Sequence, residues 1–311
     1  MNDTALVLSV AAAVGAAIPI ALAGLGELLA ERSGVLNLGI EGMMLVGAVT
    51  AFLVGDGTGN LWLALLVGMV AAAGLALVHA FLCVTMRANQ IVSGLALVIF
   101  GTGLATFLGK PIEGRPLATD LRAIDLGPLA DIPVVGPVLF VQDPLVYATV
   151  VLTAAIAFYL DRTRPGLSLR AVGESPATAD STGVDVARTR YLHVAIGGAL
   201  AGAGGAYLIL GQVPSWSQAG TTSGLGWIAL ALVVFASWNP WRVLFGALLF
   251  GLARRANFFL QDAGVSVPAE LLATLPYLLT IVVLVIWGSR DLRRRVGAPA
   301  ALGLAFVRDE R

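Results

Sequence analysis

Long apolar runs separated by short polar or proline- and glycine-rich stretches dominate the sequence. Most runs are about 20 residues long, which is the length that an α-helix needs to cross the hydrocarbon core of a bilayer. The runs lack the alternation of apolar and polar residues that is typical of membrane β-barrel strands. The pattern predicts an all-α, polytopic transmembrane helix bundle with about nine spans, within a range of roughly seven to ten. The expected spans are residues 5–28, 35–55, 61–83, 90–109, 143–161, 191–211, 225–240, 242–260 and 270–288.

Two of these runs, 225–240 and 242–260, do not fit a simple span. The first is short and ends at Pro240, and the second contains Arg254 and Arg255. Either the two arginines extend their charged ends to the outer interface, or the pair of runs enters the membrane and leaves it on the same side. The sequence leaves both alternatives open.

The composition supports insertion into a membrane. Of the 311 residues, 58% are hydrophobic and 12% are charged, whereas about 25% of the residues of a soluble domain are charged. The net charge is zero, and the basic residues form no tract suited to nucleic acid. The single cysteine, Cys83, excludes an intramolecular disulfide. Since no domain boundary is evident, we expect one transmembrane domain over residues 1–311.

The basic residues are distributed unevenly between the two sides of the predicted bundle. Arginines are frequent in the segment 162–190 and after residue 289, whereas the segment 110–142 is richer in Asp and Glu than in Lys and Arg. Loops rich in Lys and Arg stay in the cytoplasm. We therefore expect the N-terminus outside, an extracytoplasmic loop at 110–142, a cytoplasmic loop at 162–190 and a cytoplasmic tail at 289–311. The predicted location is the cytoplasmic (inner) membrane.

Residues 34–47, GVLNLGIEGMMLVG, carry polar groups inside an apolar run. Asn37 and Glu41 are four residues apart, so on a helix they would share one face, with Met44 on the next turn. A carboxylate inside a membrane is costly unless it is paired or faces water, and by default it indicates a functional site. The alternative is that Glu41 is a protonated or hydrogen-bonded packing residue.

The loop 162–190 is expected to contain one short helix. Ser175 is a typical N-cap, Pro176 suits the first helical turn, and Gly183 is placed to end the helix. Such a helix below the membrane would fit a groove on a soluble partner. An amphipathic loop that lies at the membrane interface is the alternative.

Three separated stretches carry a resemblance to a known family: GLGELLAERSGVLNLGIEGMMLVGA, LRAVGESPATADSTGVD and GTTSGLGWIALALVVFASWNP. They resemble the permease subunits of bacterial ABC importers for branched-chain amino acids, simple sugars and nucleosides. The second stretch is similar to the coupling-helix loop of that group, and the resemblance covers about 22–287. Glu27, Glu31 and Arg32, together with Glu41, look closest to the branch for purine nucleosides.

The resemblance implies a transporter of several subunits. This chain would pair with a second homologous permease subunit, with ATP-binding subunits and with an extracytoplasmic substrate-binding protein. The sequence has no Walker A loop, because its one lysine, Lys110, is followed by Pro111 where that motif needs Ser or Thr. We therefore expect no enzyme activity, metal or cofactor in this chain, and ATP and Mg bound by the partner ATPase.

The resemblance also suggests roles for individual residues. ATP-driven closure of the ATPase would push the helix around 172–185 and so move the membrane helices. The residues expected to couple to the ATPase are Gly173, Glu174, Pro176, Ala177, Asp180 and Gly183. The residues expected along the substrate pathway are Asn37, Glu41, Met44, Asn89, Gln90 and Ser93, because a nucleoside or sugar needs donors and acceptors in an apolar passage.

Further polar residues are expected near the outer side of the sixth span. Gln212, Ser215, Trp216 and Gln218 would gate the passage or receive the binding protein. For Trp216 we favour membership of an ordinary aromatic belt at the bilayer surface.

A proton- or sodium-driven secondary transporter is the alternative function. In it Glu41 would be the titrating group, and the glycine-rich segments 24–28 and 224–228 would be broken helices. Against this alternative, the predicted spans hold no second deep carboxylate to partner Glu41, and the loop at 172–185 would have no purpose.

Overall fold

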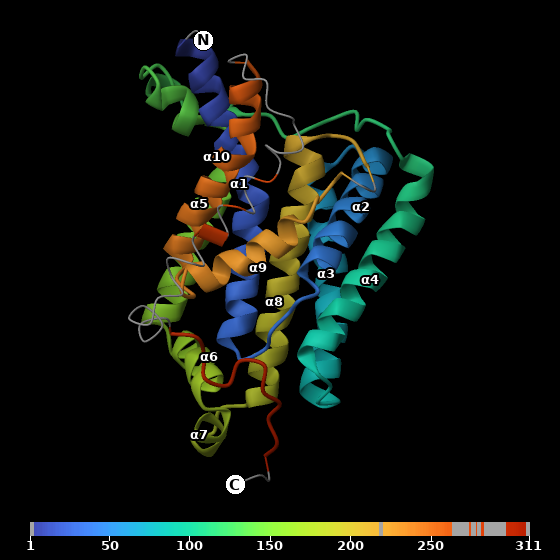
Figure 1. The fold of residues 1–311 in the computed structure, drawn as a ribbon, viewed down its shortest axis with the longest axis vertical. Helices are drawn as coiled ribbons and strands as arrows, with labels where there is room; N and C mark the ends of the chain where they lie inside the picture. The colour runs from blue at the N-terminus through green and yellow to red at the C-terminus, as the bar shows by residue number, and fades with distance from the viewer. Residues whose placement is uncertain are drawn as a thin grey trace.

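A computed structural model describes residues 3–217, 220–262 and 297–308, together with the single positions 274, 278, 281 and 282. These residues form an elongated helix bundle (Figure 1). We call the end near the N-terminus the upper end, and the end near the C-terminus the lower end (Figure 1). The span predicted at 270–288 lies almost entirely outside the described residues.

Six helices of the described part are long and apolar enough to cross a membrane. They correspond to the first six predicted runs, so the helical character of those runs is confirmed. The six are α1 (Asp3–Arg32), α2 (Ile40–Thr58), α3 (Leu61–Ala80) with its π-helical extension η1 (Phe81–Thr85), α4 (Gln90–Gly109), α5 (Pro144–Arg162), and α8 (Val186–Tyr207) with the π-helical extension η5 (Leu208–Gln212).

The helices α1, α2 and α8 form the centre of the bundle and pack closely at glycines. A Cβ atom added to Gly26 of α1 would lie 2.4 Å from the carbonyl oxygen of Gly197 in α8. A Cβ added to Gly205 of α8 would lie 1.9 Å from the carbonyl oxygen of Met44 in α2. Small residues at such contacts let helix backbones approach one another in lipid.

The two runs that fitted a span poorly form helices of different kinds. Helix α9 (Leu225–Phe235) has 11 residues and starts inside the bundle, where it lies obliquely (Figure 1). Helix α10 (Pro240–Asp262) runs antiparallel to α1 (Figure 1). Near its start Val243 lies against Gly24 of α1, and further along Gly251 lies against Ala13. The chain thus turns between α9 and α10 beside the end of α1, where Trp238 contacts Glu31 and Arg32, and returns toward the upper end.

The predicted extracytoplasmic loop 110–142 lies at the upper end and contains only short elements (Figure 1). A two-stranded antiparallel sheet places Ile124 opposite Gln142. The prolines and glycines of this segment disfavour longer helices and strands. The elements are η2 (Lys110–Ile112), β1 (Ile124–Asp125), η3 (Gly127–Leu129), η4 (Gly136–Phe140) and β2 (Val141–Gln142).

The loop 162–190 forms two helices at the lower end, α6 (Arg164–Glu174) and α7 (Pro176–Ser181) (Figure 1). Helix α7 is the predicted short helix: the Ser175 side chain accepts from the N–H of Thr178, and Pro176 opens the first turn. Gly183 follows in a left-handed conformation with φ of 87°. The expectation of a single helix is wrong, because Thr163 caps a further helix that Pro165 helps to start.

Candidate functional site

The chain is interrupted between α1 and α2, and residues 33–39 are not helical. Asn37 therefore does not share a helix face with Glu41, as the spacing had predicted. Its side-chain Oδ1 accepts from the N–H of Gly39 at 3.0 Å, and its own N–H donates to the carboxylate of Glu27 at 3.0 Å. An Asn that bonds its local backbone in this way competes with helix formation. The helix consequently begins only at Ile40.

Side chains from α3 and α4 hold the same interruption from its other side. The Gln90 side-chain oxygen accepts from the N–H of Leu36 at 2.7 Å. The Leu36 carbonyl lies 3.0 Å from Nε2 of His79, so this nitrogen must carry the donated proton. Nδ1 of His79 lies 3.0 Å from the hydroxyl of Ser93 and is left to accept from it. Every one of these side chains is buried.

Two buried carboxylates on α1, Glu27 and Glu31, tie this helix to irregular parts of the chain. Glu27 binds the interruption through Asn37. Glu31, one turn further, accepts from the indole Nε1 of Trp238 at 2.5 Å. Trp238 belongs to the turn between α9 and α10, where Ser237 and Trp238 have φ of 50° and 53°. The sequence linked the two carboxylates only to a resemblance, because Trp238 is 207 residues away from Glu31 and the bond from Asn37 to Glu27 depends on the interruption.

The carboxylate of Glu41 binds the start of α9. Oε1 accepts from the hydroxyl of Thr222 at 2.5 Å and from the N–H of Gly224 at 3.1 Å. Oε2 accepts from the N–H of Gly226 at 2.7 Å. The first N–H groups of a helix lack partners within the helix and carry a partial positive charge, so a carboxylate is stabilised there. Glu41 therefore supplies acceptors for the N–H groups at the start of a helix inside the bundle. This agrees with the alternative in which Glu41 is a hydrogen-bonded packing residue.

The six residues predicted along a substrate pathway fall into separate places. Asn37, Gln90 and Ser93 meet around the interruption, whereas Glu41 lies at α9. Met44 is fully buried against α8. Asn89 is exposed and caps α4 by accepting from the N–H of Val92 at 3.1 Å. His79, for which no role was predicted, belongs with the first group.

A cavity of about 320 Å³ opens at the upper end of the described residues. Gln212 and Ser215, both predicted near the outer side, line its wall. Six of the eleven lining residues have side chains that can form hydrogen bonds, and two of these six are arginines of α10. The residues that line it are Ala16, Leu208, Ile209, Gln212, Val213, Ser215, Ser217, Gly220, Thr221, Arg254 and Arg255.

Trp216 does not belong to an aromatic belt at the bilayer surface. Its side chain is 1% exposed and packs against Gly109 at the end of α4. A Cβ added to Gly109 would lie 2.1 Å from the indole Nε1, so the missing side chain makes room for the ring. Gln218, the remaining residue of that prediction, lies outside the described residues.

A buried hydrogen-bond chain leads from the cavity wall to the start of α5. The amide of Gln212 donates to the hydroxyl of Tyr207 at 3.4 Å, and this hydroxyl donates to the carboxylate of Asp143. The same carboxylate caps α5 by accepting from the N–H groups of Leu145 and Val146. Hydrogen bonds therefore connect Gln212 at the cavity to the end of α8 and to the start of α5.

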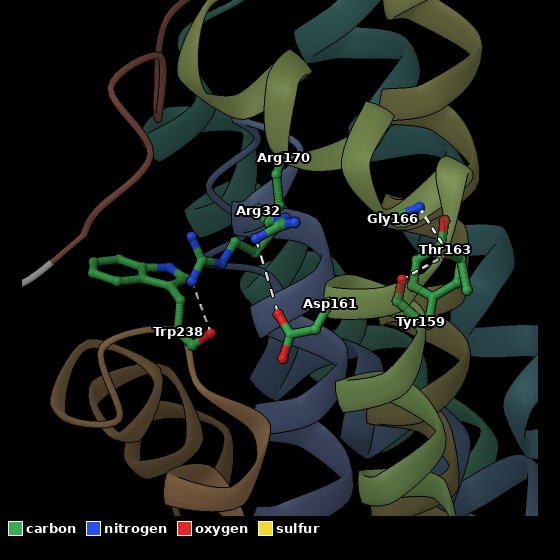
Figure 2. A network of polar contacts seen from close by, with 7 residues as sticks. All are labelled: Arg32, Tyr159, Asp161, Thr163, Gly166, Arg170 and Trp238. Atoms are coloured by element: carbon green, nitrogen blue, oxygen red, sulfur yellow. Dashed lines mark hydrogen bonds and ion pairs between the residues drawn. The ribbon is translucent and has the colours of Figure 1, made fainter.

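At the lower end α6 and α7 attach to the membrane helices through contacts of α6. A Cβ added to Gly173 would lie 2.2 Å from the carbonyl oxygen of Arg32, so only glycine permits this close approach of α6 to the end of α1. Arg32 donates to the carbonyl of Trp238 at 3.1 Å, and Arg170 of α6 lies 3.9 Å from Asp161 of α5 (Figure 2).

Thr163 makes the junction between α5 and α6 compact. Its hydroxyl donates to the carbonyl of Tyr159 at 2.6 Å and accepts from the N–H of Gly166 at 3.1 Å (Figure 2). A Cβ on Gly166 would lie 1.9 Å from the same Tyr159 carbonyl. Helix α6 is therefore held in a fixed direction relative to α5.

The predicted coupling residues differ in exposure. Glu174, Ala177 and Gly183 are exposed, whereas Gly173 is buried against α1. Pro176 is half-buried, and so is Asp180, whose carboxylate lies 3.2 Å from Nε of Arg308. The α6–α7 pair thus presents one exposed surface and one surface packed on the rest of the chain.

Comparison with known proteins gives a consistent result over nearly the whole chain. A family model described as branched-chain amino acid transport system / permease component matches residues 9–284. The “Putative glucose ABC transporter permease protein TsgC13” of Haloferax volcanii is 43% identical over 321 residues, which cover 96% of this chain and 97% of the relative.

Two further relatives carry names that refer to nucleosides. The guanosine ABC transporter permease protein NupQ of Bacillus subtilis is 35% identical, over 95% of this chain and 95% of the relative. The nucleoside ABC transporter permease protein NupC of Lactococcus lactis is 32% identical, over 94% of each chain. No solved structure matches the chain.

Proposed function

The chain belongs to the family of permease components of branched-chain amino acid transport systems, and from this premise we propose that it carries nucleosides or related simple sugars. It is a non-catalytic membrane subunit of an ABC importer, and ATP is hydrolysed by a partner ATPase. In our proposal a second homologous permease completes the passage, and ATP and Mg are bound by the ATPase alone.

The substrate class rests on the relatives and on the chemistry of the upper cavity. The Bacillus and Lactococcus relatives carry guanosine and nucleoside in their names, and the Haloferax relative carries glucose. Nucleosides and sugars both present hydroxyl groups that need donors and acceptors. The cavity volume of about 320 Å³ lies in the range of small-molecule sites, and amide, hydroxyl and guanidinium groups line it.

We place the entry of substrate at this cavity rather than at the six residues first expected. Asn37, Gln90 and Ser93 are occupied in holding the interruption between α1 and α2. Gln212 and Ser215 instead line the cavity. In this proposal the upper end faces the outside, and the extracytoplasmic binding protein delivers substrate there.

The observation that carries ATP-driven coupling is the attachment of α6 to the end of α1 at Gly173. Backbone meets backbone at this contact, with no side chain between to absorb a displacement. We propose that the exposed surface of α6 and α7, with Glu174 and Ala177, docks on the ATPase in the cytoplasm. A displacement of this pair would be passed directly to α1. The two conformational states of the permease would then differ in how well they bind the ATPase.

The ion-driven alternative loses its main support, although the expectation that the spans hold no second buried carboxylate is wrong, because Glu27 and Glu31 are buried on α1. Glu41 would have to take up and release a proton, yet its carboxylate accepts three hydrogen bonds from the start of α9. The family membership also favours the ATP-driven importer.

Uptake in cells that lack this subunit tests the proposal. We expect uptake of radiolabelled guanosine to be lost, to return with the wild-type gene, and to persist when the proton gradient is collapsed at constant ATP. Labelled glucose measured in parallel distinguishes a nucleoside importer from a sugar importer. Uptake of either that stops with the proton gradient would refute ATP-driven transport.

A further inference from the structure

The segment 297–308, which we call the strap, crosses the lower end of the molecule without helix or strand and turns at 300–303 (Figure 1). The sequence predicted only a cytoplasmic tail here. We propose that the strap positions the α6–α7 pair and transmits its movement to the interruption between α1 and α2. This inference rests on the proposed coupling role of α6 and α7 and adds a second route from that pair into the membrane helices.

The strap binds the end of α6 through its backbone. The N–H of Ala301 donates to the carbonyl of Gly173 at 2.9 Å, and the N–H of Ala300 donates to the carboxylate of Glu174 at 3.4 Å. Ala301 is 5% exposed, and a Cβ on Gly173 would lie 3.2 Å from the ring of Pro299. The contact is therefore packed closely as well as hydrogen-bonded.

Two residues further along, the strap binds the interruption itself. The N–H of Gly303 donates to the carbonyl of Gly34 at 3.2 Å. Gly34 has φ of 88°, and a Cβ there would lie 3.2 Å from the carbonyl oxygen of Ala301. A residue with a side chain would be strained by this backbone conformation and crowded by the strap.

Arg190 fastens the same region from α8. This side chain is 1% exposed, and it donates from Nε to the carbonyl of Ser33 at 3.2 Å and from Nη1 to the carbonyl of Leu304 at 3.1 Å. One buried guanidinium thus holds the interruption and the strap together. These two carbonyls offset part of the cost of burying the guanidinium, whose Nη2 has no hydrogen-bond partner among the described residues.

The end of the strap covers α7. Phe306 packs on a small apolar cluster formed by Val172, Ala179 and Val186, which come from α6, α7 and α8. Beyond it, Nε of Arg308 lies 3.2 Å from the carboxylate of Asp180. The aromatic contact should dominate, because the Arg308 side chain is 78% exposed and exposed ion pairs contribute little.

These contacts form a continuous path from the α6–α7 pair to α2. It runs from Gly173 through Ala301 and Gly303 to Gly34, and the interruption then leads to Glu41 and the start of α9. A displacement of α6 must either move the strap and Gly34 with it or break the hydrogen bonds of the strap. The strap therefore makes the interruption, in addition to the end of α1, responsive to the ATPase.

The test uses the complete importer, purified and reconstituted into proteoliposomes, with Phe306→Asp and a chain ending at Gly297 as variants. Leu304→Ser is the matched control, because its side chain is 59% exposed and the carbonyl that Arg190 needs remains. We measure guanosine uptake, ATP hydrolysis, and hydrogen exchange of the amides of residues 164–181. The last measurement requires no transported substrate.

We expect Phe306→Asp to lower uptake per ATP hydrolysed about fivefold or more, the smallest change typical of a lost coupling. Exchange in 164–181 should accelerate in the assembled complex, and Leu304→Ser should match the wild type. If the truncated chain does not assemble, Phe306→Asp alone decides. Unchanged exchange and an unchanged ratio of uptake to hydrolysis in Phe306→Asp would overturn the inference.

Ala177→Arg in the same assay separates this inference from the proposed function, because Ala177 is exposed on α7, whereas Glu174 also binds the strap through the N–H of Ala300. If Ala177→Arg uncouples hydrolysis from uptake and Phe306→Asp does not, the strap has no part in coupling while the α6–α7 pair retains its role. If Ala177→Arg and Gly173→Ala both leave coupling unchanged, the proposed role of the α6–α7 pair fails as well.

Discussion

Glu41 of α2 and Gly226 of α9 are joined by a hydrogen bond of 2.7 Å across 185 residues of sequence. A Cβ on Gly226 would lie 2.7 Å from Cα of Glu41, so the two helices also touch through their backbones. The contact fixes where α9 begins inside the bundle. A carboxylate that looked available for substrate or protons is thus engaged in holding a short helix.

We predict that Glu41→Gln lowers the stability of the subunit. A glutamine side chain has one acceptor oxygen, so at least one of the N–H groups of Gly224 and Gly226 would lose its partner. A buried donor without a partner costs about 1–3 kcal/mol. Thermal unfolding of the purified subunit in detergent, followed by fluorescence, should show a lower melting temperature, while uptake remains independent of the proton gradient.

Asp56→Asn in the same helix is the control for this substitution. Asp56 lies 3.4 Å from Arg115 in a partly exposed pair, and such pairs contribute about 0–1 kcal/mol. An unchanged melting temperature in Glu41→Gln, combined with loss of uptake, would return Glu41 to the substrate pathway.

A second prediction concerns Gly173→Ala. The added methyl group would lie 2.2 Å from the carbonyl oxygen of Arg32, and both sides of the contact are backbone, so α6 has to move away from α1. We expect the complex to assemble and to hydrolyse ATP with reduced uptake. The measurement is the number of guanosine molecules taken up per ATP hydrolysed in proteoliposomes.

Gly74→Ala provides the matched control, because a Cβ at this position of α3 meets nothing within 4 Å. Alanine is favoured over glycine in a helix by about 1 kcal/mol, so this variant should be as stable as the wild type or slightly more stable. Normal coupling in both variants would show that the contact between α6 and α1 does not transmit movement.

Hydropathy and local capping signals predicted the long helices and α7 correctly. The first six runs are helical because each is apolar over about 20 residues, a property of the residues themselves. Helix α7 could be predicted for a similar reason, since the neighbouring residues Ser175 and Pro176 suffice to start it. These features do not depend on which helices later become neighbours.

The interruption at 33–39 and the interior start of α9 were not predictable in this way. The interruption is held by Glu27, His79 and Gln90, and the start of α9 by Glu41, all of which come from elsewhere in the chain. The spacing of Asn37 and Glu41 alone predicted that both lie on one helix face. That prediction is wrong because hydrogen bonds from other parts of the chain hold Asn37 outside the helix. The strap was missed because its contacts are mainly backbone hydrogen bonds, which leave no side-chain pattern.

We predict that His79→Phe destabilises the interruption between α1 and α2. Phenylalanine resembles histidine in shape but offers no ring nitrogen, so the partly buried Leu36 carbonyl and the buried Ser93 hydroxyl would both lose a partner. The expected cost is about 1–3 kcal/mol for each group left unsatisfied. Hydrogen exchange of residues 33–39 should accelerate, and the melting temperature should fall.

Leu77→Phe controls for the introduction of an aromatic ring into α3, because the Leu77 side chain is 44% exposed. That variant should leave the exchange of residues 33–39 unchanged. Equal exchange in His79→Phe and Leu77→Phe would mean that Gln90 and Glu27 hold the interruption without the histidine.

The last prediction tests the upper cavity as the place where substrate enters. Val213 lines the cavity and is 62% exposed, so Val213→Trp adds bulk there without displacing packed side chains. We expect the concentration of guanosine that gives half-maximal uptake to rise severalfold, because a cavity of about 320 Å³ would no longer admit a nucleoside freely. Val213→Ala should leave that concentration nearly unchanged, and so should Val151→Trp, since Val151 is 69% exposed on α5 and does not line the cavity. Equal uptake curves for Val213→Trp and Val151→Trp would place the entry route elsewhere.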